Sequence, residues 1–90
     1  MAVYMVERAL PGITMEQLAA AQKAAIEKGR EFTANGKNVR YIRSTFLPGE
    51  SKCMCLFEAP NAELVKELND AAKIPFTQIK EALDLTPQTK

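Results

Sequence analysis

Two runs of residues that favour β-strands, Val39–Phe46 and Lys52–Ala59, stand only five positions apart in this 90-residue chain. The short connection between them contains Pro48 and Gly49, a pair typical of tight turns. Strands this close in sequence are usually joined as an antiparallel hairpin. The hairpin therefore predicts an antiparallel sheet, and the rest of the chain has to supply its other strands and the layer that covers it.

The remaining segments predict two helices and two further strands. The run Val3–Arg8 is rich in strand-forming residues, and a capped, alanine-rich helix is expected over Met15–Ala34. A second helix is expected to begin after Asn61 and to end before Pro75. The segment Thr77–Leu85 is ambiguous between helix and strand, and the alternation over Ile79–Leu85 suits a short edge strand. The order strand–helix–strand–strand–helix–strand predicts a ferredoxin-like α+β fold with both helices on one face of the sheet.

Length and charge narrow the class further. Ninety residues correspond to one domain, expected over 1–86, with a short C-terminal tail over 87–90. The 12 basic and 11 acidic residues give a net charge of +1, which argues against a nucleic-acid partner. The chain holds no apolar run of membrane-spanning length and no export signal at its start, so we expect a cytoplasmic protein with free thiols.

The third predicted strand has apolar side chains on both faces. Its alternation places Cys53, Cys55 and Phe57 on one side of the sheet and Met54 and Leu56 on the other. An antiparallel sheet with one face in water should instead alternate between apolar and polar residues. We therefore predict a homodimer joined sheet to sheet, as in dimeric α+β barrels; the alternative is a half-open cleft for an apolar ligand.

Regular alternation also assigns the faces of the second predicted strand. It places Val39, Tyr41 and Arg43 on one face and Ile42 and Phe46 on the other. Tyr41 and Arg43 would then point to the same side of the sheet.

Three segments together are similar to a known family. "YMVERALPGIT", "VRYIRSTF" and "CLFEAPNAELVKELNDAAKIPFTQIKEAL" resemble, in order and over nearly the whole chain, the small bacterial proteins catalogued as nickel-binding-protein-like. The resemblance implies a ferredoxin-like fold, a dimer and a surface nickel site. This chain departs from the family pattern where Leu68 stands in place of a histidine and Asn61 in place of an acidic residue. Because the chain contains no histidine, we assign nickel binding to none of its residues.

Cys53 and Cys55 are the only cysteines, and their spacing places both thiols on one face of a strand. Buried cysteines act as small hydrophobic side chains, so packing in the core or an interface is the leading interpretation. Redox or thiol chemistry and a metal site at Cys53 and Cys55 are the alternatives. A structural zinc ion needs four ligands, more than one chain offers here.

A second candidate group is polar and consists of Glu7, Arg8, Gln22, Tyr41 and Arg43. Arg43 could bind a carboxylate or phosphate in a forked geometry, and Tyr41 could donate a hydrogen bond. Glu7 could act as a base if burial raised its pKa. The alternative is a cross-strand ion pair on the sheet, such as Glu7 with an arginine.

Two functions follow from these features. The first is a small non-catalytic binding or accessory protein without a resident cofactor. The second is a cofactor-independent enzyme of the dimeric α+β barrel kind, such as a cyclase or monooxygenase acting on a small molecule, and it depends on fold analogy. A pocket of about 300 Å³ or more that holds Glu7 or Tyr41 beside Arg43 would favour the enzyme.

Overall fold

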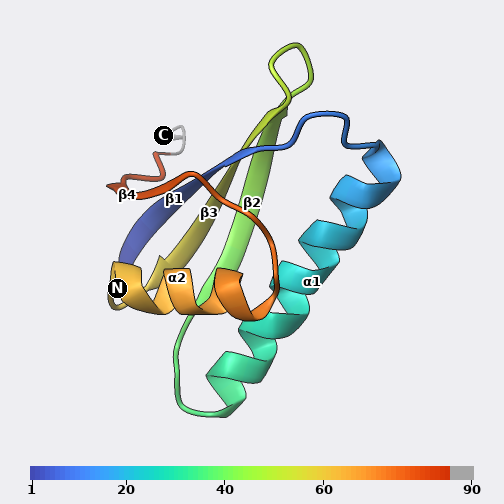
Figure 1. The fold of residues 1–90 in the computed structure, drawn as a ribbon. Coiled ribbons are helices and arrows are strands. Elements are labelled where there is room, and N and C mark those ends of the chain that lie inside the picture. The colour runs from blue at the N-terminus through green and yellow to red at the C-terminus, as the bar shows by residue number, and fades with distance from the viewer. Residues whose placement is uncertain (86–90) are drawn as a thin grey trace, which may run out of the picture.

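The computed structural model describes residues 1–85 as one layer of β-strands covered on one face by two helices (Figure 1). In chain order the elements are β1 (Ala2–Ala9), α1 (Met15–Ala34), β2 (Arg40–Leu47), β3 (Lys52–Ala59), α2 (Ala62–Ala71) and β4 (Gln78–Ala82). This is the predicted ferredoxin-like order, so the α+β fold class is confirmed. The expected domain end at 86 and the tail over 87–90 lie outside the described residues.

The four strands form one antiparallel sheet in the order β2-β3-β1-β4. At the centre of the sheet, Val6 of β1 lies between Cys55 of β3 and Ile79 of β4. The predicted hairpin of β2 and β3 is present, and β2 and β4 form the two edges. The buried residues of the four strands all lie on the two central strands, β1 and β3.

Helix α1 begins at the predicted residue because its first turn is capped. The Gln17 backbone N–H donates to Thr14 Oγ1 at 3.1 Å, and the Thr14 backbone N–H donates to Gln17 Oε1 at 3.0 Å. Gly36, with φ of 84°, follows the helix in the left-handed conformation that glycine adopts without strain. Ala25 and Gly29 are buried, and their small size lets α1 approach β2 and α2.

Helix α2 is capped by Asn61, whose Oδ1 accepts a hydrogen bond from the Leu64 backbone N–H at 2.9 Å. Its buried stripe contains Val65 and Leu68, and also the polar residue Asn69. Within residues 1–85, neither helix has a stretch long and apolar enough to cross a membrane.

Strand β2 contains a bulge that regular alternation does not predict. Tyr41 pairs with Phe57, but the next pair along the ladder joins Arg43 to Leu56, so Ile42 has no partner on β3. An extra residue on one strand shifts every following side chain to the opposite face. The prediction that Tyr41 and Arg43 share a face is therefore wrong: Tyr41 lies under the helices, and Arg43 lies on the open face.

The same bulge moves the later residues of β2. Ser44 pairs with Cys55 and Phe46 with Cys53, so both join the helix-covered face. The expectation that Phe46 points to the opposite side from Tyr41 is wrong for the same reason.

The open face of the sheet carries a band of apolar side chains. Its central members, which are partly exposed, are Val3 and Met5 of β1 and Met54 and Leu56 of β3. Charged groups surround this band and include an ion pair between Arg40 and Glu58 at 3.2 Å. The predicted apolar character of both faces is thus present in the described residues.

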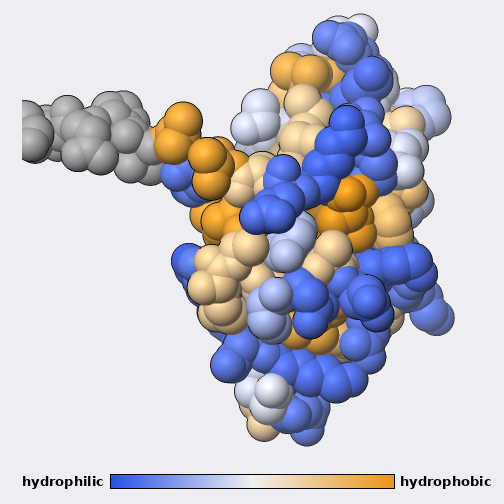
Figure 2. Space-filling view, turned by 90° about the vertical axis from the view of Figure 1, so that its left-hand side faces the viewer, coloured by the Kyte–Doolittle hydropathy of each residue, from blue (hydrophilic) through white to orange (hydrophobic). Residues whose placement is uncertain are grey.

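The chain after β4 crosses this open face. Strand β4 ends at Ala82, three residues before the end of the expected alternation at Leu85. Asp84 then forms an ion pair with Arg43, which belongs to the far edge strand β2. Leu83 and Leu85 flank Asp84 with 82% and 83% of their surface exposed. Figure 2 shows hydrophobic surface gathered where the described chain ends.

Candidate functional site

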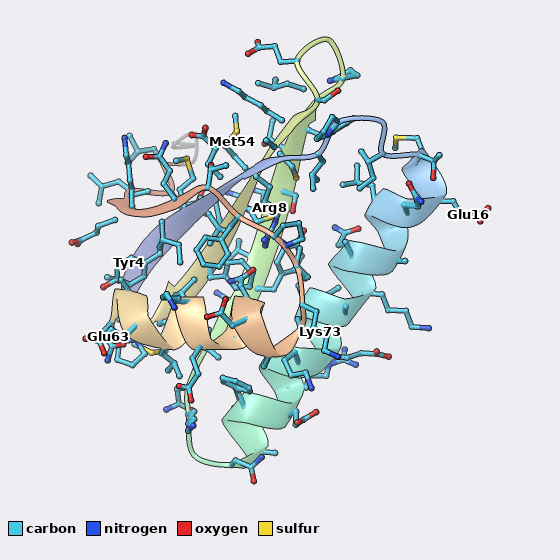
Figure 3. The ribbon with its side chains drawn as sticks, in the orientation of Figure 1. Tyr4, Arg8, Glu16, Met54, Glu63 and Lys73 are labelled. Atoms are coloured by element: carbon cyan, nitrogen blue, oxygen red, sulfur yellow. The ribbon has the colours of Figure 1, made fainter. Side chains whose placement is uncertain are left out.

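A cavity of about 160 Å³ lies between α1 and the helix-covered face of the sheet. Its wall is mostly aliphatic and aromatic. Polar groups come from β1, from α1 and from both strands of the β2–β3 hairpin. These groups are Arg8, Gln22, Tyr41, Ser44, Cys53 and Cys55. Figure 3 shows Arg8 near the middle of the molecule, between the sheet and the helices.

Arg8, near the end of β1, is only 2% exposed. Its guanidinium donates to Asn69 Oδ1 at 2.6 Å, to the Pro75 carbonyl oxygen at 3.1 Å and to Cys55 Sγ, through Nε, at 3.3 Å. Asn69 is fixed in turn, because its amide donates to the Val65 carbonyl oxygen at 2.8 Å. One side chain thus joins β1, β3, α2 and the loop that follows α2.

The partners of Arg8 are an amide, a carbonyl and a thiol. Among residues 1–85, no carboxylate forms an ion pair with it. An uncompensated charge in a protein interior costs several kcal/mol even after hydrogen bonding and relaxation. Within residues 1–85, Cys55 is the only ionisable group to which Arg8 is hydrogen-bonded. The cavity is therefore electropositive at the place where it meets the cysteines.

A chain of hydrogen bonds leads from the surface to Cys55. Gln22 Nε2 donates to the Tyr41 hydroxyl at 2.9 Å, and the Tyr41 and Ser44 oxygens are 2.6 Å apart. Ser44 Oγ donates to Cys55 Sγ at 3.0 Å, so Tyr41 is the donor in its bond with Ser44. Cys55 Sγ thus accepts hydrogen bonds from both Ser44 and Arg8.

Both cysteines are free and buried. Their Sγ atoms are 3.8 Å apart on the helix-covered face of β3. Burial raises the pKa of the Cys53 thiol to about 11, and the neighbouring Cys55 adds to the increase, while a hydrogen bond from Ser44 and the charge of Arg8 oppose it. At neutral pH Cys53 is therefore a protonated thiol beside Cys55.

The five polar residues singled out from the sequence do not form one site. Arg8, Gln22 and Tyr41 meet at the cavity. Glu7 and Arg43 lie on the open face, where Glu7 Oε1 accepts a hydrogen bond from Gln78 and Arg43 pairs with Asp84. The sheet itself separates the two groups.

Sequence reasoning missed two members of the network. Ser44 was hidden by the bulge, which reverses the face of β2 on which it lies. Asn69 carried a usable signal, since it stands four residues after Val65, on the buried stripe of α2. A polar side chain on a buried stripe needs a partner, and here that partner is Arg8.

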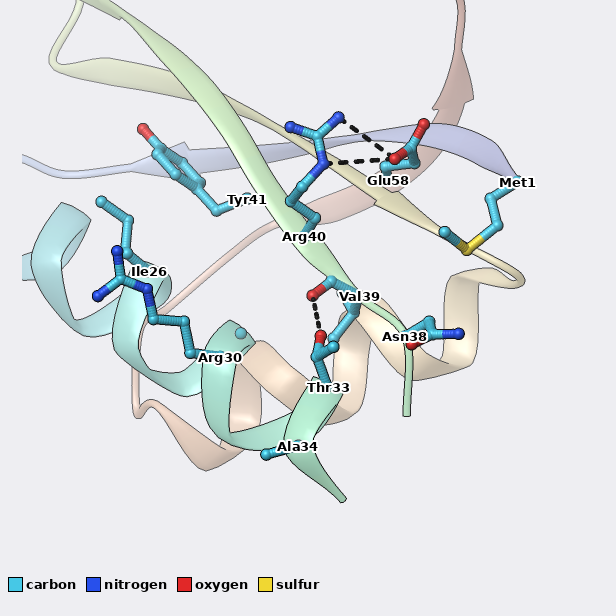
Figure 4. Close-up of a pocket in the computed structure, with 11 residues that line it drawn as sticks. Met1, Ile26, Arg30, Thr33, Ala34, Asn38, Val39, Arg40, Tyr41 and Glu58 are labelled. Carbon is cyan, nitrogen blue, oxygen red and sulfur yellow. Dashed lines mark hydrogen bonds and ion pairs between the residues drawn. The ribbon is translucent and has the colours of Figure 1, made fainter. Parts of the chain in front are cut away.

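A larger groove, of about 680 Å³, lies between the C-terminal half of α1 and the edge strand β2 (Figure 4). Several of its polar groups are already paired on the protein: Thr33 Oγ1 donates to the Val39 carbonyl oxygen at 3.2 Å, and Arg40 pairs with Glu58. Arg30 and Arg40 in its wall are exposed. The smaller cavity is therefore the better candidate site, because its charged group is buried and its thiols face it.

The fold and the cavity together define a small ferredoxin-like α+β protein with a thiol-lined, arginine-containing cavity under its first helix. The family model for nickel responsive proteins, SCO4226-like, matches residues 4–81, so the chain belongs to this family. This finding confirms the resemblance inferred from the sequence. The crystal structure of SCO4226 from Streptomyces coelicolor A3(2) is similar, with a TM-score of 0.78 and 27% identity over 94% of this chain and 100% of that chain. No curated protein matches the chain.

The family description raises the question of whether residues of this chain fit a nickel ion. Imidazole is a favoured nickel ligand, and the chain has no histidine. In the part of the chain that the structure describes, no three side chains of Cys, Asp or Glu come together. Cys53 and Cys55 are only two ligands, and the Arg8 guanidinium beside them repels a cation. These residues do not fit nickel.

Proposed function

We propose that the chain is a small, non-catalytic accessory protein that binds a small anionic ligand in the cavity beside Arg8. The observation that supports this function is the buried guanidinium without a carboxylate partner among the described residues. A ligand carboxylate or another oxyanion would supply the missing negative charge through charge-assisted hydrogen bonds. The hydroxyl groups of Tyr41 and Ser44, which line the same cavity, would turn from their present acceptors to donate to the ligand.

The cavity limits the size of that ligand. Its volume of about 160 Å³ is below the range of roughly 300–1,000 Å³ that holds drug-sized molecules. The ligand is therefore expected to have only a few heavy atoms, as acetate, formate or inorganic phosphate do. The exposed side chain of Gln22 stands at the cavity wall and marks the side of α1 from which such a molecule would enter.

The geometry gives less support to the alternative of a cofactor-independent enzyme. That interpretation asks for a larger pocket holding Glu7 or Tyr41 beside Arg43. Tyr41 lines both the cavity and the larger groove, but Glu7 and Arg43 are among the lining residues of neither, because they lie on the other face of the sheet. A binding role accounts for the buried arginine without requiring a general base.

We also propose that two copies associate through the open faces of their sheets, in the cytoplasm, where free thiols persist. The apolar band of Val3, Met5, Met54 and Leu56 supports this arrangement, because a partner sheet would remove it from water. The exposed side chains of Leu83 and Leu85 lie along the segment that crosses the same face.

Isothermal titration calorimetry of the purified protein tests the ligand class. We expect formate, acetate or phosphate to bind, and Arg8→Met to reduce the affinity at least about tenfold, since it removes the charged donor. Arg30→Met, which removes an exposed arginine of α1, is the matched control and should leave the affinity unchanged.

Nickel, copper and zinc salts serve as the second arm of the titration. Absence of binding by every anion, or equal affinities for the wild type and Arg8→Met, would reject the anion site. Binding of nickel at one ion per chain would instead favour a metal role.

A further inference from the structure

We infer that Cys55 is a reactive thiol that reduces a hydroperoxide and then forms a reversible disulfide with Cys53. This inference shares the cavity with the proposed function but does not depend on ligand binding. It concerns the protein without a bound anion, in which Cys55 is, in the described part of the chain, the only ionisable group hydrogen-bonded to Arg8.

The donors around Cys55 direct hydrogen bonds and positive charge at its sulfur, and the thiolate is the nucleophilic form of cysteine. Its sulfur accepts from Arg8 Nε at 3.3 Å and from Ser44 Oγ at 3.0 Å. A nearby arginine cation is typical of reactive cysteines, whereas inert structural cysteines lie in apolar surroundings. The guanidinium is held in place by Asn69 and Pro75, so it cannot turn away from the sulfur without losing those bonds.

The cavity gives a small oxidant access to this sulfur. Both cysteines line it, and its wall includes the exposed residue Gln22. A space of about 160 Å³ holds several water-sized molecules, since one water needs roughly 30 Å³ of liquid volume. Hydrogen peroxide and short alkyl hydroperoxides are therefore small enough to reach Cys55, while protein disulfides and large oxidants are excluded.

The first step transfers one oxygen atom. The Cys55 thiolate attacks the terminal oxygen of the hydroperoxide ROOH, so an S–O bond forms and the O–O bond breaks. Cys55 becomes a sulfenic acid, oxidised by two electrons, and the peroxide is reduced to the alcohol ROH, which takes one proton from water. The positive charge of Arg8 in the cavity wall stabilises the alkoxide that departs when the O–O bond breaks.

The second step uses the neighbouring thiol. Cys53 Sγ is 3.8 Å from Cys55 Sγ, close enough to attack once the strand adjusts to the length of about 2.05 Å of an S–S bond. Cys53 displaces the hydroxyl group of the sulfenic acid, which leaves as water with the Cys53 proton, and the S–S bond replaces the S–O bond. Cys55, whose sulfur accepts from Arg8 and Ser44, acts first, and Cys53, 3.8 Å away, acts second.

The product should be easily reduced. Residues two apart on a strand have Cα atoms about 6.5–7 Å apart, at the upper limit for a disulfide. Strained disulfides have higher potentials and behave as labile, regulatory bonds. This spacing makes a permanent structural disulfide unfavourable and suits a reversible one.

Intact-mass spectrometry of reduced protein treated with a small excess of hydrogen peroxide tests the sequence of steps. The wild type is expected to lose about 2 Da on forming the disulfide, and to regain it with dithiothreitol. Cys53→Ala should gain about 16 Da and be trapped by dimedone, since its sulfenic acid has no resolving thiol. Cys55→Ala should stay unmodified at the same peroxide concentration.

Rates measured on the Cys53→Ala background test the role of the donors. Adding Arg8→Met should slow sulfenic acid formation at least about tenfold, and Ser44→Ala, which makes a smaller change, should slow it several-fold. Arg30→Met is the control and should react at the parent rate.

Any one of three results would overturn the inference. They are oxidation of Cys53 while Cys55 stays unmodified, a rate of oxidation no faster than that of free cysteine, and equal rates with and without the two donors. Stable sulfenic acid in the wild type would overturn the disulfide step. Failure of anions to bind leaves all of these readouts unchanged, so the two proposals fail separately.

Discussion

At the scale of single residues, the side chain of Arg8 joins β1 to β3, to α2 and to the loop after α2. Alternation along β1 places it on the same side as Tyr4 and Val6, so its face could be predicted from the sequence. Its three hydrogen bonds could not, because Asn69 and Pro75 are more than sixty positions away and meet it only through the packing of α2. Local sequence patterns predict the face of a strand on which a side chain lies. They do not predict a hydrogen-bond partner that is distant in the sequence.

Removal of this side chain should destabilise the fold. Arg8→Ala leaves the Asn69 amide oxygen and the Pro75 carbonyl oxygen without their donor, and it opens space beside Cys55. Losses of this kind cost about 2–4 kcal/mol in the free energy of unfolding, which urea titration followed by circular dichroism would measure. The exposed Arg30→Ala should change it by less than about 0.5 kcal/mol. Similar values for the two variants would contradict the structural role of Arg8.

Cys53 should make stability depend on alkaline pH. Its folded-state pKa of about 11 lies above the ordinary thiol value of 9.0. A raised pKa means that the unfolded chain releases the proton first, so the stabilisation is complete below pH 9 and is lost as pH rises toward 11. The wild type should therefore lose up to about 2 kcal/mol more than Cys53→Ala between pH 8.5 and 11. Parallel pH profiles for the two proteins would contradict the buried, protonated state of Cys53.

At the scale of elements, caps and turns made the helices predictable, and one bulge made β2 unpredictable. Thr14 and Asn61 cap α1 and α2 at the positions that the sequence indicates. The bulge at Ile42 has no local signal, because it contains neither glycine nor proline. Because Ile42 is unpaired, regular alternation assigned Arg43 and Phe46 to the wrong faces. It also placed polar residues that lie on opposite faces of the sheet in one candidate site.

Two glycines in and after α1 should respond to alanine in opposite ways. At Gly29 an added Cβ would meet the Val39 carbonyl oxygen at 3.5 Å and Leu68 Cδ1 at 3.8 Å, which are ordinary contacts. Because alanine favours helix over glycine, Gly29→Ala should raise the free energy of unfolding by about 0.5–1 kcal/mol. Gly36 has a φ of 84°, so Gly36→Ala should lower it by about 1 kcal/mol.

Denaturant unfolding of the two variants beside the wild type measures both changes. A destabilised Gly29→Ala would mean that α1 packs more tightly against β2 and α2 than these contacts allow. An unchanged Gly36→Ala would mean that the turn after α1 does not need the left-handed conformation.

At the scale of the whole molecule, the two faces of the sheet have different roles. The helix-covered face holds the cavity, the buried arginine and both thiols. The open face holds an apolar band with charged groups around it, and the segment after β4 crosses it. Alternation in β3 was sufficient to predict the apolar band, since Met54 and Leu56 are successive side chains on the face opposite to Cys53 and Cys55.

Association through the open face should be sensitive to a single charge at its centre. Leu56 lies on the central strand β3, directly opposite Met5 of β1 and Arg43 of β2. In a sheet-to-sheet dimer, Leu56→Lys would bury an unpaired ammonium group, which costs several kcal/mol. We expect the wild type to sediment as a dimer at micromolar concentration, and Leu56→Lys to sediment as a folded monomer with a dissociation constant raised at least about 100-fold. Met15→Lys is the matched control, because Met15 is an exposed apolar residue at the start of α1, on the opposite side of the sheet, and it should remain dimeric. A monomeric wild type, or a Leu56→Lys variant that dimerises like the wild type, would show that the open face is not the interface.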